Sequence, residues 1–514
     1  MKYLFNQLKV SLDDKRSLAT IVAAKLHTAQ SSFSISILKK SIDARKSDIF
    51  YIYNLLIDSK KELHHRSLQS FKEIEPLLVP IWPHKDRPVI VGFGPAGMFS
   101  GLVLARSGAK PLIVEKGKNV EDRLDDIEKL RSKTIFSDTS NICFGEGGAG
   151  MFSDGKLYTG VNDKNTKFIL EEFVKHGAPL SILYDANPHI GSDILPSICK
   201  GIREEIESLG GEILFDSEMV GVDPCGLVVR SSGEEHIIRT SHILLAIGHS
   251  APDLLEKLIE QGLKVEPRDF SIGVRIEHLQ ADINKARYHG FEQKFDLPSA
   301  NYKVFEHLPN NRTVYSFCMC PGGEVINSST EPDSIVTNGM SRSGRNGVNG
   351  NAAILVNVKV EDFYKGDPLD GFRYRKELEE KAFRKDLPYY APAQKVSDFL
   401  AGKPTNAFGR ILPTYLPGVY GADLNEFLPS YISESLKLAI LKFKERLPFF
   451  ADGDAILTGF ETRSSSPVRI PRDEHGESSI KGLYPIGEGA SYAGGITSSA
   501  LDGVKIALAI LTKN

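Results

Sequence analysis

Long apolar runs are missing from this chain. Its 514 residues are 41% hydrophobic and 25% charged, and no uninterrupted apolar window of about 18 residues predicts a membrane-spanning helix. The first residues, Met1 to Gln7, also lack the apolar core and the small-residue cleavage site of a signal peptide. These absences predict a cytoplasmic protein with no membrane span, and the length predicts two or three domains.

Cysteine is scarce as well. The five cysteines form neither an even disulfide framework nor a CxxC pair, which fits a reducing compartment and disfavours structural zinc, so we expect no metal. Cys318 and Cys320 are separated by one residue. On a regular strand their side chains share a face, but their Cα atoms lie near the upper limit for a disulfide. Structural burial is therefore preferred over a substrate-facing thiol, and a redox dithiol is disfavoured.

A strong excess of one charge is also missing, because the net charge is only −3. The charge is uneven, however: residues 1–87 hold 15 Lys and Arg against 9 Asp and Glu. This basic piece could face an acidic partner or the acidic remainder of the chain. It lacks the aromatic and basic interleaving of RNA-binding modules, which argues against a nucleic-acid partner.

The most informative motif of the sequence begins at Val89. A β-branched run leads into Gly92-x-Gly94-x-x-Gly97-x-x-x-Gly101, and an apolar helical pattern follows. This order predicts strand, tight turn and helix, with Gly94 admitting a pyrophosphate and the helix N-terminus facing it. The candidate cofactor-binding residues of this turn are Gly92, Gly94, Pro95, Ala96 and Gly97.

A second strand, Pro111 to Val114, ends in Glu115. An acid at this distance from the glycines can accept hydrogen bonds from a ribose diol. A helix is expected from Asn119 to Lys133, and a glycine-rich loop follows at residues 144–156. Such a loop can bring backbone amides against a ligand, although a flexible hairpin tip is the alternative. The further cofactor candidates here are Lys116, Arg123, Gly147, Gly148 and Ala149.

Four segments divide the chain in this interpretation. Residues 1–80 predict a small basic β-α-β-β domain whose helix is capped by Asp13 or Asp14, and residues 85–266 predict the first part of a nucleotide-binding domain. That part closes with a buried strand at Ile243 to His249, which contains Gly248. Residues 267–454 predict an inserted α+β substrate domain, and residues 455–514 the rest of the nucleotide-binding domain. The fold class is therefore α/β, with a discontinuous Rossmann-like domain.

The carboxyl-terminal segment has its own signature. A strand ends at Gly487 and Glu488, and an apolar helix begins after Gly494 and Gly495, near Ile496. The helix dipole would stabilise negative charge that develops at its N-terminus. Gly487, Glu488, Gly495 and Ile496 complete the candidate cofactor site.

Several motifs together carry a family resemblance: GFGPAGM, NICFGEGGAGMFSDGKL, LAIGHSAPD, DFSIGVRIEH, CMCPGGEVINSS, TNGMSRS, ETRSSSPVRIPRD and YPIGEGASYAGGITSSALDG. The chain resembles a family of poorly characterised bacterial FAD-dependent dehydrogenases along nearly its whole length. The resemblance implies a tightly bound FAD in a glutathione-reductase-like fold, in which Glu488 would hold a ribityl hydroxyl. Most signatures of this type have Asp at that position. The family also leads us to expect an arginine before Asp253, where this chain has Pro252.

Four residues are candidates for catalysis. Arg463 and Arg469 lie in a segment rich in arginine and hydroxyl groups ahead of Glu488, where guanidinium groups could bind an anionic substrate. The alternative is that they form salt bridges with Glu461 and Asp473. His189 is a possible proton donor, although a structural histidine is more common. Cys318 is the fourth candidate, as a substrate-facing thiol.

Two functions remain open from the sequence. The preferred one is an FAD-dependent oxidoreductase, a dehydrogenase or reductase that transfers hydride or electrons between flavin and a small organic substrate, for which the arginine segment predicts an anionic group. The alternative is a flavin-containing RNA- or protein-modification factor that docks its target through the basic amino-terminal domain. A second GxGxxG after a strand is missing from residues 267–454, so a dedicated NAD(P)H domain is not expected.

Overall fold

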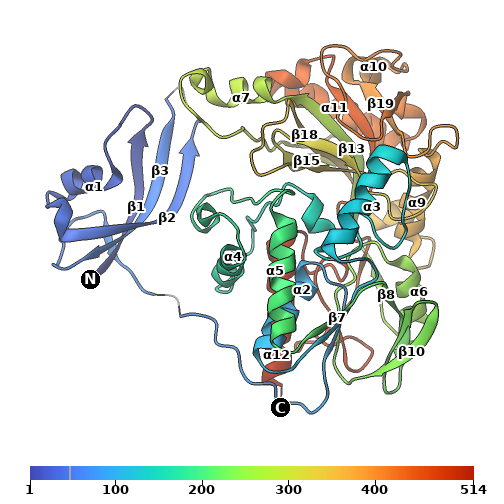
Figure 1. Cartoon of the computed structure of the whole chain (residues 1–514). Helices are drawn as coiled ribbons and strands as arrows, with labels where there is room; N and C mark the ends of the chain where they lie inside the picture. Colours follow the sequence, from blue (N-terminus) through green and yellow to red (C-terminus); the bar gives the residue numbers. More distant parts are fainter. Residues whose placement is uncertain (46–47, 74, 514) are drawn as a thin grey trace.

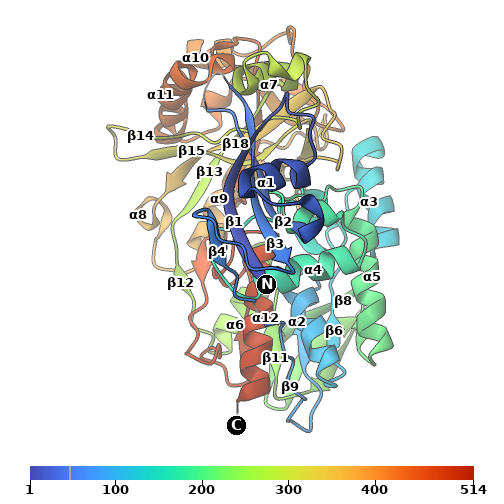
Figure 2. The same ribbon diagram turned by 90° about the vertical axis from the view of Figure 1, so that its left-hand side faces the viewer.

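The computed structural model describes residues 1–45, 48–73 and 75–513 and divides into a small amino-terminal domain and a two-part body. Figure 1 shows the amino-terminal sheet standing to one side, a parallel sheet with its helices at the base of the body, and a second, larger sheet above it. Figure 2 shows the same arrangement with the amino-terminal domain in front of the body.

The amino-terminal domain has the predicted β-α-β-β order and adds a short fourth strand. Alternating apolar residues bury one face of the sheet, whose order is β2-β3-β1-β4, against helix α1. The helix is capped by Ser17, whose hydroxyl accepts from the Thr20 amide at 3.1 Å, and not by Asp13 or Asp14 as we expected. The elements are β1 (Lys2–Ser11), α1 (Leu18–Leu26), β2 (Phe33–Asp43), β3 (Phe50–Ser59) and β4 (Leu68–Ser70).

Strand β2 attaches this domain to the body. The Lys40 amide donates to the carbonyl of Tyr184 at 2.7 Å, and the Ala186 amide donates to the carbonyl of Lys40 at 2.8 Å. Apolar residues at the end of the sheet, Leu12 and Ile49, also join the hydrophobic core of the larger sheet. Backbone pairing and shared apolar burial therefore hold the domain on the body.

The nucleotide-binding domain is built on a five-stranded parallel sheet of order β23-β11-β5-β6-β7. Its strands read as short β-branched runs because both faces are covered. Helices α2, α5 and α12 pack on one face, and strands of a small antiparallel sheet cover the other. The elements are β5 (Val89–Val91), α2 (Pro95–Arg106), β6 (Leu112–Val114), α3 (Val120–Lys133), α4 (Thr166–Lys175), α5 (Leu195–Ser208), β7 (Glu212–Leu214), β8 (Ser217–Asp223), β9 (Gly226–Ser231), β10 (Glu234–Arg239), β11 (Ile243–Leu245), α6 (Pro252–Glu260), β23 (Leu483–Pro485) and α12 (Ile496–Thr512).

The inserted domain is a seven-stranded mixed sheet of order β14-β15-β18-β13-β21-β19-β20, with helices packed against it. Short pairs β12–β22 and β16–β17 flank it. The elements are β12 (Glu266–Pro267), β13 (Phe270–Leu279), α7 (Gln280–Tyr288), β14 (Phe305–His307), β15 (Thr313–Cys320), β16 (Glu324–Asn327), β17 (Thr337–Met340), β18 (Asn349–Val358), α8 (Val360–Phe363), α9 (Asp370–Lys381), β19 (Ala391–Lys395), α10 (Val396–Ala401), β20 (Val419–Gly421), α11 (Ser430–Arg446), β21 (Ile456–Glu461) and β22 (Val468–Arg469).

The structure corrects one predicted boundary. We expected the insert to end at residue 454, but β21 pairs with β13 and β19 and so belongs to the insert's sheet. The sequence pattern missed this because a fully buried strand looks the same in either domain. Among the residues that the structure describes, no helix combines the length and the apolar character needed to cross a membrane.

Candidate functional site

A large cavity lies where the two parts of the body meet, with a volume of about 1640 Å³. This exceeds the roughly 300–1,000 Å³ of ordinary small-molecule sites. Its walls come from the β5–α2 turn, the glycine-rich loop, the end of β11, the connection from β23 to α12, and strand β15 of the insert. The cavity therefore reaches from the carboxyl ends of the parallel strands to the inserted sheet, which is where open α/β sheets bind ligands.

The glycine turn after β5 has two kinds of glycine. Gly92 has a φ of +98°, and a Cβ there would lie 2.4 Å from the carbonyl oxygen of Ala246. A Cβ on Gly97 would lie 1.9 Å from the carbonyl oxygen of Gly92. A Cβ on Gly94 has its nearest neighbour, the Cα of Gly148, at 3.7 Å. Gly92 and Gly97 therefore allow backbone segments to pack closely, whereas the missing side chain of Gly94 leaves space in the cavity.

Two helices begin at this cavity. Helix α2 starts after Gly94 and helix α12 after Gly495, and both glycines, together with Pro95 and Ile496, line the cavity wall. A glycine cap has no side chain to satisfy the first amides, so these amides are available to a ligand. Both helices present the positive ends of their dipoles to the cavity.

Glu115 connects the turn to the glycine-rich loop. One carboxylate oxygen accepts from the Phe93 amide at 2.7 Å, and the other accepts from the amides of Gly117 and Gly145 at 2.9 Å each. A carboxylate has about four acceptor positions, so about one remains for a ribose hydroxyl. Glu115 lines the cavity, and its first role here is to hold two loops together.

Arg123 does not lie in the cavity wall, and this corrects its assignment as a cofactor-binding residue. Its side chain is fully buried in α3. The guanidinium donates to five backbone carbonyls, three in the glycine-rich loop and two just before it, at 2.5 to 3.2 Å. Arg123 therefore shapes the loop from behind, and its long side chain reaches partners 18 to 25 positions away.

The remaining predicted cofactor residues fall into two groups, those that line the cavity and those that lie behind its wall. Gly97, Gly147 and Gly487 lie behind the wall, where their missing side chains let the backbones pack closely. Lys116 lines the cavity and lies 3.6 Å from Glu218. The predicted residues that do line the cavity are Gly92, Gly94, Pro95, Ala96, Glu115, Lys116, Gly148, Ala149, Gly248, Glu488, Gly495 and Ile496.

Arg463 lines the cavity, but its guanidinium is already paired. It donates to both carboxylate oxygens of Glu379, at 3.0 and 2.6 Å, and approaches Glu331 at 3.4 Å and the hydroxyl of Thr330. Neither acid is one of the expected partners, because Glu461 instead pairs with Arg275 at 3.3 Å. A guanidinium held between two carboxylates offers little attraction to an anionic substrate, so the geometry favours the ion-pair interpretation.

Arg469 and His189 both lie outside the cavity wall, which corrects their assignment to catalysis. Arg469 is exposed and lies over the ring of Tyr492 at 5.0 Å. His189 directs Nε2 toward the carbonyl of Ser343 at 3.0 Å, and burial lowers its pKa. Both residues therefore belong to the scaffold of the site.

Three further charged or polar groups line the cavity, and one of them, His249, is a second possible proton donor from the sequence alone. His249 follows β11, and burial together with nearby Arg375 lowers its pKa to about 3, so it is neutral at pH 7. Glu461, at the end of β21, has its pKa raised to about 7 by burial. Lys156 lies 3.0 Å from Asp154. The motif around Lys156 was visible in the sequence, whereas Glu461 could be found only from the sheet pairing.

Comparison with known proteins gives the family. Residues 269–464 match the family model described as "FAD-dependent protein, C-terminal domain-like", and residues 1–58 match a domain of unknown function. An uncharacterised protein of Clostridium beijerinckii is 40% identical over 530 aligned residues, which cover 100% of this chain and 99% of the relative. The chain belongs to this family of FAD-dependent proteins.

Solved structures of lower similarity also match parts of the chain. Glycine oxidase from Geobacillus kaustophilus is 13% identical, with a TM-score of 0.37, and covers 83% of this chain and 94% of its own. A geranylgeranyl bacteriochlorophyll reductase-like protein from Thermoplasma acidophilum is 13% identical, with a TM-score of 0.36, and covers 81% of this chain and 76% of its own. At these scores the family assignment rests on the relative and the family model.

The cavity of this FAD-dependent protein fits its cofactor. The open position at Gly94 and the start of α2 suit a pyrophosphate. Glu115 lies at the end of the next strand, where its carboxylate can accept a hydrogen bond from the ribose. Glu488 and the start of α12 lie further along the same cavity, at the position expected for the ribityl chain and the flavin ring. The residues present can therefore hold FAD.

Glu488 gives the FAD-dependent protein a testable pH dependence. Burial, assisted by the charge of nearby Cys318, raises its pKa from 4.5 to about 7. Between these values the folded protein binds a proton that the unfolded chain has released, so the free energy of unfolding falls as pH rises. In the flavin-free Glu488→Gln variant, the free energy of unfolding should fall with pH less steeply than in flavin-free wild type, by up to about 1.4 kcal/mol per pH unit. Urea unfolding at a series of pH values measures it, and identical pH profiles would contradict the buried, protonated state.

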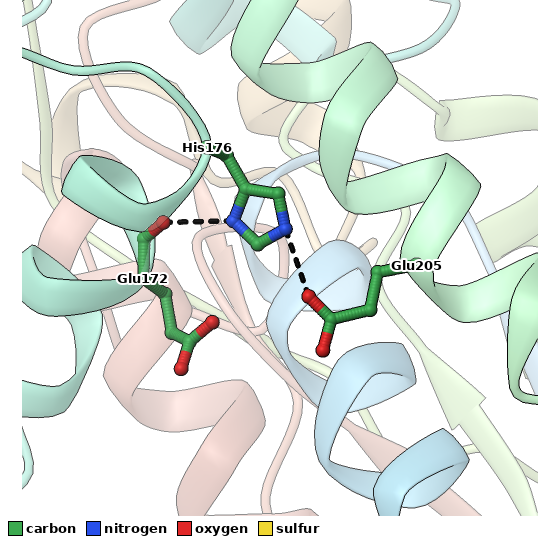
Figure 3. Close-up of side chains that lie close together, drawn as sticks. All are labelled: Glu172, His176 and Glu205. Atoms are coloured by element: carbon green, nitrogen blue, oxygen red, sulfur yellow. Dashed lines mark hydrogen bonds and ion pairs between the residues drawn. The ribbon is translucent and has the colours of Figure 1, made fainter.

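A cluster of possible metal ligands lies away from the cavity, between α4 and α5. Figure 3 shows His176 between Glu172 and Glu205. One ring nitrogen faces the Glu172 carbonyl at 2.8 Å and the other faces the Glu205 carboxylate at 2.9 Å. Arg106 donates to both carboxylates, at 2.6 to 2.9 Å. These partners occupy the ligand atoms, so we interpret the cluster as an ion-pair network that joins three helices.

Proposed function

We propose that this FAD-dependent protein is an oxidoreductase, a dehydrogenase or reductase that acts on a small organic substrate in the cytoplasm. The observation that carries the proposal is that one continuous cavity is lined both by the predicted FAD-binding residues and by the inserted sheet. A substrate held by β15 and β21 would lie beside the predicted flavin end at Glu488. The five cysteines are free thiols, which suits the proposed reducing compartment.

Bound FAD supplies the redox chemistry, accepting or giving a hydride or two electrons. The chain supplies position and charge. The N-terminus of α12 would stabilise negative charge at the end of the cavity where it begins. Glu461 and Glu488, each with a pKa raised to about 7, can hold or release a proton near neutral pH.

An anionic substrate stays a prediction, and Arg463 no longer supports it. The paired guanidinium is a poor candidate for substrate recognition. Lys156 is the cavity cation that we propose to test. Its partner Asp154 is also bound by Arg345 at 2.9 Å, so Asp154 neutralises the charge of Lys156 only in part. Tighter binding of carboxylate inhibitors than of their amides, lost in Lys156→Met, would support an anionic substrate.

Anaerobic flavin reduction tests the proposed function. We expect small organic substrates drawn from a panel of acids, amines and alcohols to bleach the flavin absorbance in a saturable way. NADH and NADPH should reduce it slowly, because residues 267–454 contain no second GxGxxG after a strand. Rapid, saturable bleaching by either nicotinamide would contradict the absence of a nicotinamide site. If reduced protein passed electrons to no organic acceptor and no donor bleached it, an oxidoreductase would be excluded.

A further inference from the structure

Strand β15 is irregular where its two cysteines lie. Its pairing with β18 shifts between Phe317 and Cys320, and Cys318 has a φ of +43°. A regular strand would place the two Cα atoms about 6.8 Å apart, at the upper limit for a disulfide. A bulge with a left-handed residue shortens that path and turns one side chain out of the alternating pattern. The geometric objection to a Cys318–Cys320 disulfide assumed a regular strand, and this part of β15 is not regular.

The Cys320 thiol contacts the backbone of Cys318, and one cation, Arg275, binds both residues. Cys320 Sγ lies 3.2 Å from the carbonyl oxygen of Cys318. Arg275 Nη2 donates to the same carbonyl at 2.9 Å and lies 3.6 Å from Cys320 Sγ. A hydrogen bond from the Cys320 thiol lowers the pKa of Cys318, while burial raises the pKa of Cys320. Of the two thiols, Cys318 is therefore the one that loses its proton more easily.

The surrounding charges stabilise a thiolate at Cys318. The positive charges of Lys156 and Arg275 favour it, and Asp154 opposes it. Asp154 is largely neutralised because Arg345 and Lys156 both pair with it. The cluster holds three cations, Lys156, Arg275 and Arg345, against two acids, Asp154 and Glu461. A Cys318 thiolate would balance the third positive charge.

Cys318 also faces the flavin end of the cavity. Its side chain lines the cavity together with Glu488 and Gly495, whereas Cys320 is fully buried behind it. The charge of Cys318 is close enough to contribute to the raised pKa of Glu488. The accessible sulfur therefore lies toward the residue that is predicted to hold the ribityl chain, and the buried sulfur lies away from it.

We propose that Cys318 and Cys320 form a redox-active pair that exchanges two electrons with the flavin. In the oxidising direction, the Cys318 thiolate and the Cys320 thiol form one S–S bond and the Cys320 S–H bond breaks. The electron pair and the released proton pass to oxidised flavin, which becomes the reduced flavin anion. In the reverse direction, reduced flavin opens the disulfide to thiolate and thiol. The pair would thus store two electrons beside the cofactor.

An anaerobic reductive titration of the FAD-loaded protein, after oxidation in air, tests this pair. Wild-type protein should take up twice the electron equivalents per flavin that Cys320→Ser takes up, because the disulfide accepts two electrons in addition to the flavin. Cys143→Ser is the matched control, since it removes another thiol that lines the same cavity, and it should behave as wild type. Equal uptake by wild type and Cys320→Ser would overturn the proposal.

A second measurement uses the wild-type protein alone and does not depend on a folded variant. The air-oxidised protein is denatured in an alkylating reagent and its peptides are weighed. We expect the peptide with Cys318 and Cys320 to be unalkylated and lighter by two hydrogens, and to be alkylated twice after anaerobic photoreduction of the flavin. Two alkylated cysteines in the air-oxidised sample would overturn the pair. The proposal rests on bound FAD and not on the substrate, so this failure would leave the proposed oxidoreductase activity standing.

Discussion

Replacing Gly94 with valine should give folded but colourless protein. The nearest neighbour of a Cβ at this position is 3.7 Å away, so the polypeptide can accept a side chain here. That side chain would project into the cavity where the glycine turn admits a pyrophosphate. We expect loss of essentially all bound FAD, measured as the ratio of flavin to protein absorbance after purification.

The control for this prediction is the smaller substitution Gly94→Ala. Its single methyl group occupies less of the cavity, so it should retain more FAD than the valine variant, and both should match flavin-free wild type in circular dichroism and melting temperature. Full flavin retention in Gly94→Val would mean that the pyrophosphate lies elsewhere. Loss of folded protein would mean that the turn, and not the cofactor, requires glycine.

Removing Arg463 from the Arg463–Glu379 pair should cost the protein about 3–5 kcal/mol of unfolding free energy, because the Glu379 charge is left buried without this partner. The two side chains are 4% and 0% exposed and their closest atoms are 2.6 Å apart. We expect Arg463→Met to show this loss in urea unfolding, and Glu379→Gln to show a smaller loss because Arg463 keeps Glu331 at 3.4 Å. The double variant Arg463→Met/Glu379→Leu should recover much of it, since the two residues act as one unit.

Arg469→Met is the matched control, because this arginine lies in the same segment but is exposed. It should change the unfolding free energy by less than about 1 kcal/mol. If the Arg463→Lys variant kept normal stability but bound anionic inhibitors more weakly, a substrate role for Arg463 would be restored.

The strand, turn and helix of the glycine fingerprint were predicted correctly from the sequence, as were α3, β11, β23 and α12. These elements follow local rules, since buried parallel strands read as apolar runs and a left-handed turn requires glycine. The FAD cofactor and the family also followed from the sequence, because the motifs extend over nearly the whole chain. The match of residues 269–464 to a family model of FAD-dependent proteins confirms the cofactor, and the full-length relative supports the family.

The errors concern long side chains and irregular backbone. Arg123 and Arg463 were assigned to ligands, but their guanidinium groups bind partners 18 to 25 and 84 positions away along the chain. Nothing in a local pattern states which distant oxygen an arginine will reach. The interpretation of Cys318 and Cys320 assumed a regular strand, and the bulge in β15 removed that assumption.

The sequence by itself determined the cofactor, the parallel sheet and the position of the glycine turn, because each depends on residues that are close along the chain. Only the tertiary structure decided which side chains face the cavity. It joined the glycine turn to the loop at Gly148, brought β15 of the insert to the flavin end, and used Arg123 and Arg463 to hold the walls. The physical reason is that a buried charge must find its partner within a few ångströms, and that partner is chosen by packing between elements far apart in the sequence.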